Sequence, residues 1–160
     1  MIYKAVRHSG NQSSCEKKAL AIKQLTNTLL KTPHHWVDSS GNSNQLLPEH
    51  ILIVAPYNAQ VGLLKRVLPE IANIGTVDKF QGRQAPIVMY SMTSSSVADA
   101  PRGMSFLFSP NRFYVATSRA KCSVIVFSNR DLVTDECKTP EQIKWANGLC
   151  RFVEASSRQQ

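Results

Sequence analysis

A chain of 160 residues with 42% hydrophobic and 19% charged residues is long enough for one folded domain with a buried core, and its composition excludes a disordered protein. No apolar run approaches the ~20 residues that a membrane-spanning helix needs, and the first ten residues lack signal-peptide features. The net charge of +8 favours a polyanionic partner, either nucleic acid or nucleotide phosphate, although a solvated basic surface would give the same charge.

The distribution of charge and the spacing of the cysteines indicate the kind of partner and the redox environment of the protein. Seven cations and a single acid, Asp99, lie between Lys79 and Arg130, which strengthens the case for a phosphate-bearing partner. The four cysteines form no C-x-x-C pair and have no histidine at ligand spacing. We therefore expect reduced thiols in a cytoplasmic protein, with no disulfide and no metal site.

Apolar spacing and turn residues divide the chain into alternating strands and helices. In chain order we expect a strand at 1–6, a helix at 13–31, a loop at 32–50, a strand at 51–56, a helix at 58–69, strands at 73–78 and 85–92, a long loop at 93–110, a helix at 111–120, a strand at 121–128 and a closing helix at 139–155. No linker or repeat divides these elements, so residues 1–160 form a single domain.

Several side chains are expected at particular places on these elements. Ser13 or Ser14 should cap the first helix, and Asn58 the second. Lysines 17, 18 and 23 are expected on the exposed face of the first helix, and Ile143 on the buried face of the last. Short buried strands that alternate with helices predict an α/β fold with a mainly parallel central sheet. Ligands of such sheets bind beyond the carboxyl ends of the strands, where we place both residues 79–84 and "APYNAQ".

Segment 79–84, "KFQGRQ", is unusually polar for a connection between two strands. Gly82 allows a close approach of backbone to a partner, and Arg83 offers a planar guanidinium fork that suits phosphate or carboxylate. Gln81 and Gln84 supply both hydrogen-bond donors and acceptors. A loop held by its own hydrogen bonds is the alternative, and these residues alone do not decide between the two.

The segment "SPNRFYVATSRAK" is expected to form a helix from Pro110, with one apolar face. Arg112 and Arg119 are seven residues apart, so on a continuous helix they would share one edge at a spacing of roughly 10 Å. Two arginines in line would suit a bound triphosphate. Surface arginines that cover apolar shoulders with their stems are the alternative.

Three segments in this order, "ILIVAPYNAQVGLL", "TVDKFQGRQAPIVMYSM" and "NRFYVATSRAK", resemble motifs IV, V and VI of superfamily 1 helicases. The resemblance is greatest to the 5′-to-3′ branch and to helicases fused to a RecB-like nuclease domain. It implies the second RecA-like (P-loop NTPase type) motor domain of a DNA helicase, with a role in DNA repair. The implied partners are single-stranded DNA, the first RecA-like domain and a RecB-like nuclease domain of the same native chain.

The resemblance also implies roles for individual residues. Arg119, in "TSRAK", would be the catalytic arginine finger on the γ-phosphate of ATP. Residues of the Q-G-x-E segment and the neighbouring helix would contact the nucleotide: Gln81, Gly82, Arg83, Gln84 and Arg112. Gln84 stands where the family usually has Glu, and its carbonyl is a weaker acceptor for the ribose hydroxyls than a carboxylate. Tyr57, Asn58 and Thr76 would contact the nucleic-acid backbone, although Tyr57 could equally pack under its own helix.

The sequence contains no G-x-x-x-x-G-K-[ST] phosphate loop and no apolar run followed by Asp-Glu to hold Mg²⁺. We therefore expect a fragment of a longer chain, in which the first motor domain binds most of ATP and Mg²⁺ and this domain alone is inactive. Matches to the (Asp/Glu)-x-Lys half of a nuclease motif lack strand context, so nuclease activity in this chain is rejected. The alternative function is a non-catalytic nucleic-acid-binding module derived from a helicase, which the exchange at Gln84 favours.

Overall fold

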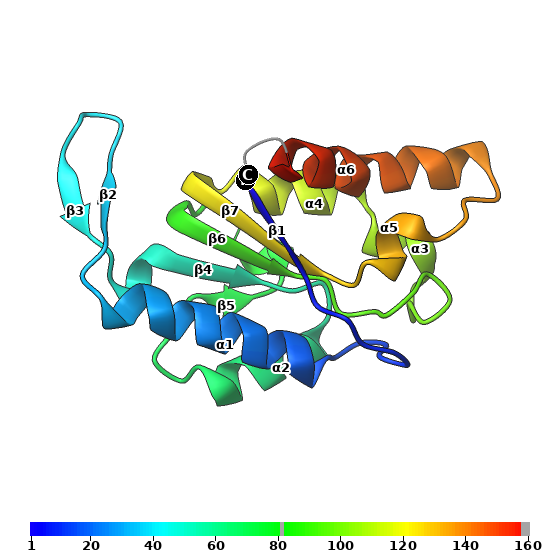
Figure 1. Cartoon of the computed structure of the whole chain (residues 1–160), viewed down its shortest axis with the longest axis horizontal. Coiled ribbons are helices and arrows are strands. Elements are labelled where there is room, and N and C mark those ends of the chain that lie inside the picture. Colours follow the sequence, from blue (N-terminus) through cyan, green and yellow to red (C-terminus); the bar gives the residue numbers. More distant parts are fainter. Residues whose placement is uncertain (81, 158–160) are drawn as a thin grey trace.

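The computed structural model describes residues 1–80 and 82–157. Its centre is a five-stranded parallel sheet. The strands lie in the order β1-β7-β6-β4-β5. Their bounds are Ile2–Ala5 for β1, Ile51–Val54 for β4, Ile74–Gly75 for β5, Ala85–Ser91 for β6 and Ala120–Ser128 for β7. Helices cover both faces (Figure 1), which confirms the predicted three-layer α/β fold and agrees with a RecA-like domain.

Two pairs of long helices form the outer layers. One face of the sheet carries α1 (Glu16–Lys31) and α2 (Asn58–Val67), and the other carries α4 (Pro110–Thr117) and α6 (Pro140–Ser157) (Figure 1). The shorter helices are α3 (Gly103–Leu107), α5 (Asp131–Thr134) and the 3₁₀ turns η1 (Pro48–His50) and η2 (Val77–Phe80). Among the described residues, no helix is both long and apolar enough to cross a bilayer.

The inner strands β4 and β6 are buried on both faces because their side chains alternate between two apolar layers. On β4, Leu52 and Val54 belong to the cluster under α4 and α6. Ile51 and Ile53 of the same strand belong to the cluster under α1 and α2. This division explains why "ILIV" reads as a continuous apolar run and why every residue of β4 is buried.

Two segments predicted as loops contain regular structure. Residues 32–50 form a hairpin of β2 (His35–Val37) and β3 (Ser43–Gln45), which Figure 1 shows projecting beyond the amino ends of the central strands. Asp38 makes the turn, because its carboxylate accepts hydrogen bonds from the backbone N–H groups of Ser40 and Asn42, each at 2.9 Å. These bonds hold the pKa of Asp38 below its usual value. The second segment, residues 93–110, contains the short helix α3.

Some predicted side-chain positions are wrong. The residue before α1 is Cys15 and the residue before α2 is Tyr57, so neither the serines nor Asn58 occupy the capping position. Lys18, expected on the exposed face of α1, is fully buried. Ile143 is 52% exposed, because the first turn of α6 extends past the sheet.

Candidate functional site

The predicted nucleotide contacts gather where β6 and β7 begin. The two strands pair from their first residues, Ala85 with Ala120, and the Ala85 N–H donates to the carbonyl of Arg119 at 3.0 Å. Residues 82–84 are exposed and lead directly into β6. The fold therefore brings them beside Arg119, although 35 or more residues separate them in the chain. Gln81 lies outside the described residues.

Two cations of the polar segment, Lys79 and Arg83, lie near the buried ring of Phe80. Phe80 is 2% exposed, and the cationic groups of Lys79 and Arg83 lie 5.8 and 6.0 Å from its ring centroid. Gly82 has φ of +79°, a conformation that side chains with a Cβ rarely adopt, which accounts for the glycine. The segment ends at the amino end of β6, so its predicted place at the carboxyl edge is wrong for residues 82–84. The reason is that β5 has only two residues, after which η2 carries the chain back along the sheet.

Arg119 occupies the turn between α4 and β7. The helix ends at Thr117, so the prediction that Arg112 and Arg119 share one helical edge is wrong. Arg119 is half-buried, and its Nε is buried with no hydrogen-bond partner among the described residues. A buried donor without an acceptor is unfavourable by roughly 1–3 kcal/mol. Because Arg119 as a whole is only half-buried, the rest of its side chain remains accessible to a ligand.

Arg112 is held by two contacts within the domain. Its Nη2 lies 3.7 Å from Oδ2 of Asp78 on η2, and its Cζ lies 4.3 Å from the ring centroid of Phe106 on α3. The side chain of Asp78 is 66% exposed, so the ion pair itself contributes little to stability. Together the contacts fix Arg112 at the junction of η2, α3 and α4.

The predicted strand contacts lie at the opposite edge, where β4 and β5 end. The Ala55 N–H donates to the Gly75 carbonyl at 3.1 Å, so the two carboxyl ends lie side by side. Asn58 is the exposed first residue of α2, three positions beyond this bond, and Thr76 is half-buried immediately after β5. Parallel topology has thus brought two of the predicted contacts together at the edge where such sheets bind ligands.

Tyr57 belongs mainly to the core. It is 7% exposed, and its ring centroid lies 5.3 Å from that of Phe106 at an interplanar angle of 31°. Burial raises the pKa of its phenol. The structure thus agrees with the alternative in which Tyr57 packs beside its helix, and it leaves Asn58 as the exposed side chain of the pair.

A buried polar network at the carboxyl ends of β6 and β7 was missed from the sequence. The Lys18 ammonium donates to the carbonyl of Met92, and burial lowers its pKa to about 7. Gln60 of α2 donates to Oγ of Ser91 at 3.1 Å. Helical spacing could have located Lys18, because it lies four residues before the buried Ile22.

Further buried hydrogen bonds hold His8, in the segment that follows β1, against Ser95 and Asn129. His8 Nδ1 and Ser95 Oγ are 2.6 Å apart, and the Asn129 amide donates to the carbonyls of both residues at 2.8 Å. His8 Nε2 is buried without a partner among the described residues. Burial, followed by the charge of Lys18, lowers the pKa of His8 to about 4. The imidazole is therefore neutral at pH 7.

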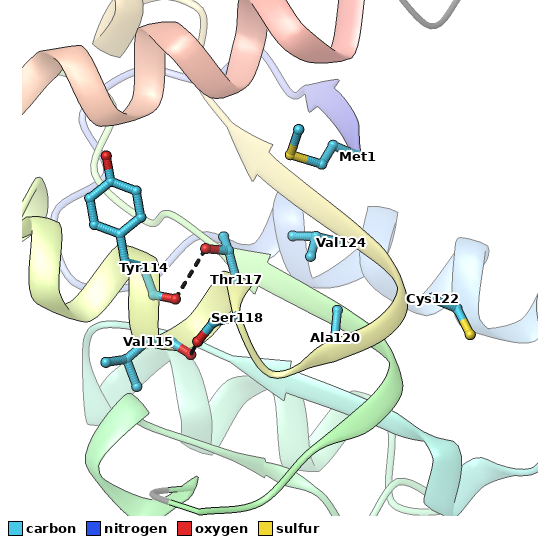
Figure 2. A pocket seen from close by; sticks show the side chains of 8 residues that line it. All are labelled: Met1, Tyr114, Val115, Thr117, Ser118, Ala120, Cys122 and Val124. Atoms are coloured by element: carbon cyan, nitrogen blue, oxygen red, sulfur yellow. Dashed lines mark hydrogen bonds between the residues drawn. The ribbon is translucent and has the colours of Figure 1, made fainter. Parts of the chain in front are cut away.

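A shallow pocket of about 480 Å³ is lined by residues at the end of α4 and the start of β7 (Figure 2). Its walls come from the end of α4, the start of β7 and Met1. They are Met1, Tyr114, Val115, Thr117, Ser118, Ala120, Cys122 and Val124. The hydroxyls of Thr117 and Ser118 donate to carbonyls of their own helix, at 2.9 and 3.1 Å for the shortest bonds. The hydroxyl protons of Thr117 and Ser118 are therefore used within the helix, and the exposed surface of the pocket is mainly apolar.

The five-stranded parallel sheet with helices on both faces is consistent with a RecA-like α/β domain. A family model described as an AAA domain matches residues 3–131, and the chain belongs to this family, AAA_12. The match includes four of the five strands in full, all of β1 except Ile2, and the turn that bears Arg119.

Three relatives are helicases by name. The chain is 34% identical over 124 residues to ATP-dependent helicase upf1 of Schizosaccharomyces pombe, which covers 71% of this chain and 13% of the relative. It is 35% identical over 101 residues to probable RNA helicase armi of Drosophila melanogaster, covering 56% and 8%. It is 35% identical over 86 residues to DNA polymerase alpha-associated DNA helicase A of S. pombe, covering 52% and 13%. The chain thus spans only a small part of each relative, and the matches support a superfamily 1 helicase motor domain.

Proposed function

We propose that this chain is the second motor domain of an ATP-dependent superfamily 1 helicase and supplies one wall of its ATP site. The observation that carries the proposal is the 3.0 Å hydrogen bond from Ala85 to Arg119. This bond joins Ala85, which directly follows Gln84, to the arginine of the "TSRAK" segment, so residues 82–84 and Arg119 lie at one edge of the sheet, as a shared nucleotide site requires. The unpartnered Nε of Arg119 supports the same assignment.

Arg119 acts in this proposal as an arginine finger. A permanently charged planar fork stabilises the charge on the γ-phosphate in the transition state, an effect of about 10³–10⁵ in rate in other phosphoryl-transfer enzymes. Gln84 and the backbone at Gly82 face the ribose and phosphates, and Arg83 adds positive charge. Arg112 is given no contact with the nucleotide in this proposal, because Asp78 and Phe106 hold its side chain at the junction of η2, α3 and α4.

The rest of the ATP site comes from a first RecA-like domain. The sequence carries no phosphate loop, so that domain would bind the β- and γ-phosphates and Mg²⁺. This chain alone would then not turn over ATP. On the resemblance, the native protein would also move 5′ to 3′ and carry a RecB-like nuclease domain.

The strand-binding edge is formed by Asn58 and Thr76, with Tyr57 beneath them as packing. The free N–H groups of the first turn of α2 and the Thr76 hydroxyl can bind backbone phosphates, which carry no base information. We propose single-stranded DNA as the substrate. Because one relative is named an RNA helicase and another a DNA helicase, RNA is the comparison that every binding experiment should include.

The decisive experiment is ATP hydrolysis stimulated by single strands, measured on the protein that contains both motor domains. Arg119→Ala should lower kcat by a factor of about 10³ or more while ATP binding is largely retained. Arg119→Lys should remain impaired, because an ammonium lacks the planar fork. Arg151→Ala, which removes an exposed charge from α6, is the matched control and should behave as wild type.

Two other results would lead to different conclusions. Equal turnover by wild type and Arg119→Ala would place the finger elsewhere and contradict the proposed site. Strand binding without any turnover, and unaffected by ATP, would instead identify the non-catalytic binding module that Gln84 favours.

A further inference from the structure

Phe106 on α3 lies against two arginines from different segments. Cζ of Arg102 lies 4.8 Å from its ring centroid, and Cζ of Arg112 lies 4.3 Å from it. Both distances are within the ~6 Å at which a guanidinium is attracted to an aromatic face. Tyr57 contacts the same ring at 5.3 Å. With three groups against it, the Phe106 ring serves as a platform for arginines and leaves little face for a base to stack on.

The charge of this cluster is unbalanced. Sharing one ring, the two guanidinium groups lie within about one Debye length of each other at 0.1 M salt (~10 Å). Arg112 has Asp78 at 3.7 Å, whereas Arg102 pairs with no carboxylate in the described part of the chain. Arg102 is also exposed. A fixed, exposed guanidinium next to a second cation is suited to bind an anion, and its fork matches the geometry of a phosphate.

The position of the cluster indicates which anion it would bind. Tyr57 directly precedes Asn58 at the carboxyl end of β4, and Asp78 is two residues beyond Thr76 at the end of β5. The Arg102–Phe106–Arg112 cluster therefore adjoins the edge where Asn58 and Thr76 lie. It is distinct from the amino edge that bears Arg119 and Gln84, so the nucleotide is the less suitable ligand.

We propose that Arg102, in contact with the Phe106 ring, binds a backbone phosphate of the same single strand that Asn58 and Thr76 contact. The inference rests on the proposed function, since it extends its strand-binding edge. Phe106 is a positioning residue, because it orients Arg102 without touching the strand. Arg112 neutralises Asp78, which would otherwise repel a phosphate.

The test is binding of single strands by this chain as salt is raised. Labelled oligothymidylate and oligouridylate of about 20 nucleotides would be titrated by fluorescence anisotropy between 50 and 200 mM salt, the range over which phosphate contacts are resolved. Arg102→Ala should weaken binding several-fold and reduce the slope of log K against log salt by about 0.7, the contribution of one phosphate contact on a single strand. Arg66→Ala, an exposed arginine in the last turn of α2, is the matched control and should change neither.

Two further variants separate charge from positioning. Arg102→Lys and Phe106→Leu both keep the charge at residue 102 but remove the contact between a guanidinium and an aromatic ring. Each should weaken binding and leave the salt slope near that of wild type. A thermal melt of each variant confirms that it is folded.

The inference is overturned if wild type binds while Arg102→Ala keeps its affinity and slope, or if Arg66→Ala loses as much. A loss confined to one of the two oligonucleotides would place Arg102 on a sugar or base and would contradict a phosphate contact. Failure of the wild-type chain to bind either probe would contradict the proposed strand-binding edge itself, and the inference with it.

Discussion

At the scale of single residues, the two arginines of the "NRFYVATSRAK" segment have different surroundings. Arg112 has both an acidic and an aromatic partner, while the Nε of Arg119 has no acceptor in the described structure. The difference arises because α4 ends at Thr117, between them. The presence of an arginine therefore does not by itself assign a catalytic role. Arg119 differs from Arg112 in that its Nε donor has no hydrogen-bond acceptor in the described structure.

Lys18 makes the stability of the domain depend on pH. Its pKa is about 7 in the folded protein and 10.5 in an exposed lysine, because burial disfavours the charged form. Between these values the unfolded chain binds more protons than the folded one, so the free energy of unfolding rises with pH from about 7 to 10.5. Below pH 7 the lysine is charged in both states, and the destabilisation is complete.

Lys18→Met should abolish this contribution. Relative to wild type, the variant should be more stable near pH 7 and lose its advantage towards pH 10, with a change in the difference on the order of 4 kcal/mol. Urea denaturation at several pH values between 7 and 10 measures it. Lys17→Met, an exposed neighbour, should follow the wild-type curve. If the difference in the free energy of unfolding between wild type and Lys18→Met did not vary with pH, burial would not lower the pKa of Lys18.

At the scale of elements, β5 and η2 form the tightest packing in the motif that the proposed function uses. A Cβ placed on Gly75 would lie 2.7 Å from Cδ of Lys79 and 2.9 Å from Cε2 of Phe80. The Phe80 ring is buried and cannot easily move aside. The glycine lets the chain turn from β5 into η2 while this ring covers it.

Gly75→Ala should therefore destabilise the domain by about 1–3 kcal/mol through overpacking. Gly62→Ala is the contrasting control, because a Cβ there meets nothing within 4 Å and lies in the interior of α2. That substitution should instead stabilise by roughly 0.5–1 kcal/mol. Thermal or chemical denaturation compares the two. Equal effects of the two substitutions would contradict the packing described for Phe80.

The elements that the sequence predicts best are those whose apolar pattern is decided by burial alone. Strands β4, β6 and β7 were located within a few residues because both of their faces meet a core layer. The hairpin of β2 and β3 was missed, since its strands have three residues each and its turn depends on Asp38 accepting backbone hydrogen bonds. Lys18 differs from the prediction because a lysine is expected at the surface, whereas its helical spacing from Ile22 places it on the buried face of α1.

At the scale of the whole molecule, the predicted site is divided between two edges of the sheet. Residues 82–84 and Arg119 lie at the amino ends of β6 and β7, whereas Asn58 and Thr76 lie at the carboxyl ends of β4 and β5. The sequence motifs identified the candidate residues but not which of them lie side by side in space, because adjacency across the sheet depends on strand order. Sequence spacing does not contain that order.

This arrangement predicts that the chain alone separates binding from catalysis. It should bind single strands, yet release no phosphate from ATP above the rate without protein, because no phosphate loop faces Arg119. A phosphate-release assay with and without oligonucleotide tests this, and the two-domain protein provides the positive control. Hydrolysis by the chain that Arg119→Ala abolishes would show that a first domain is not required.

The pairing of β1 with β7 has a consequence for how the domain is made. Ile2 lies opposite Ile125, so β1, the first of the five strands along the chain, pairs with β7, the last of them. At a synthesis rate of about 5–20 residues per second, β1 waits at least several seconds for its partner. During this interval one side of β6 also lacks β7. The nascent domain thus exposes strand edges until β7 has been translated, and such edges can pair with other chains in the meantime.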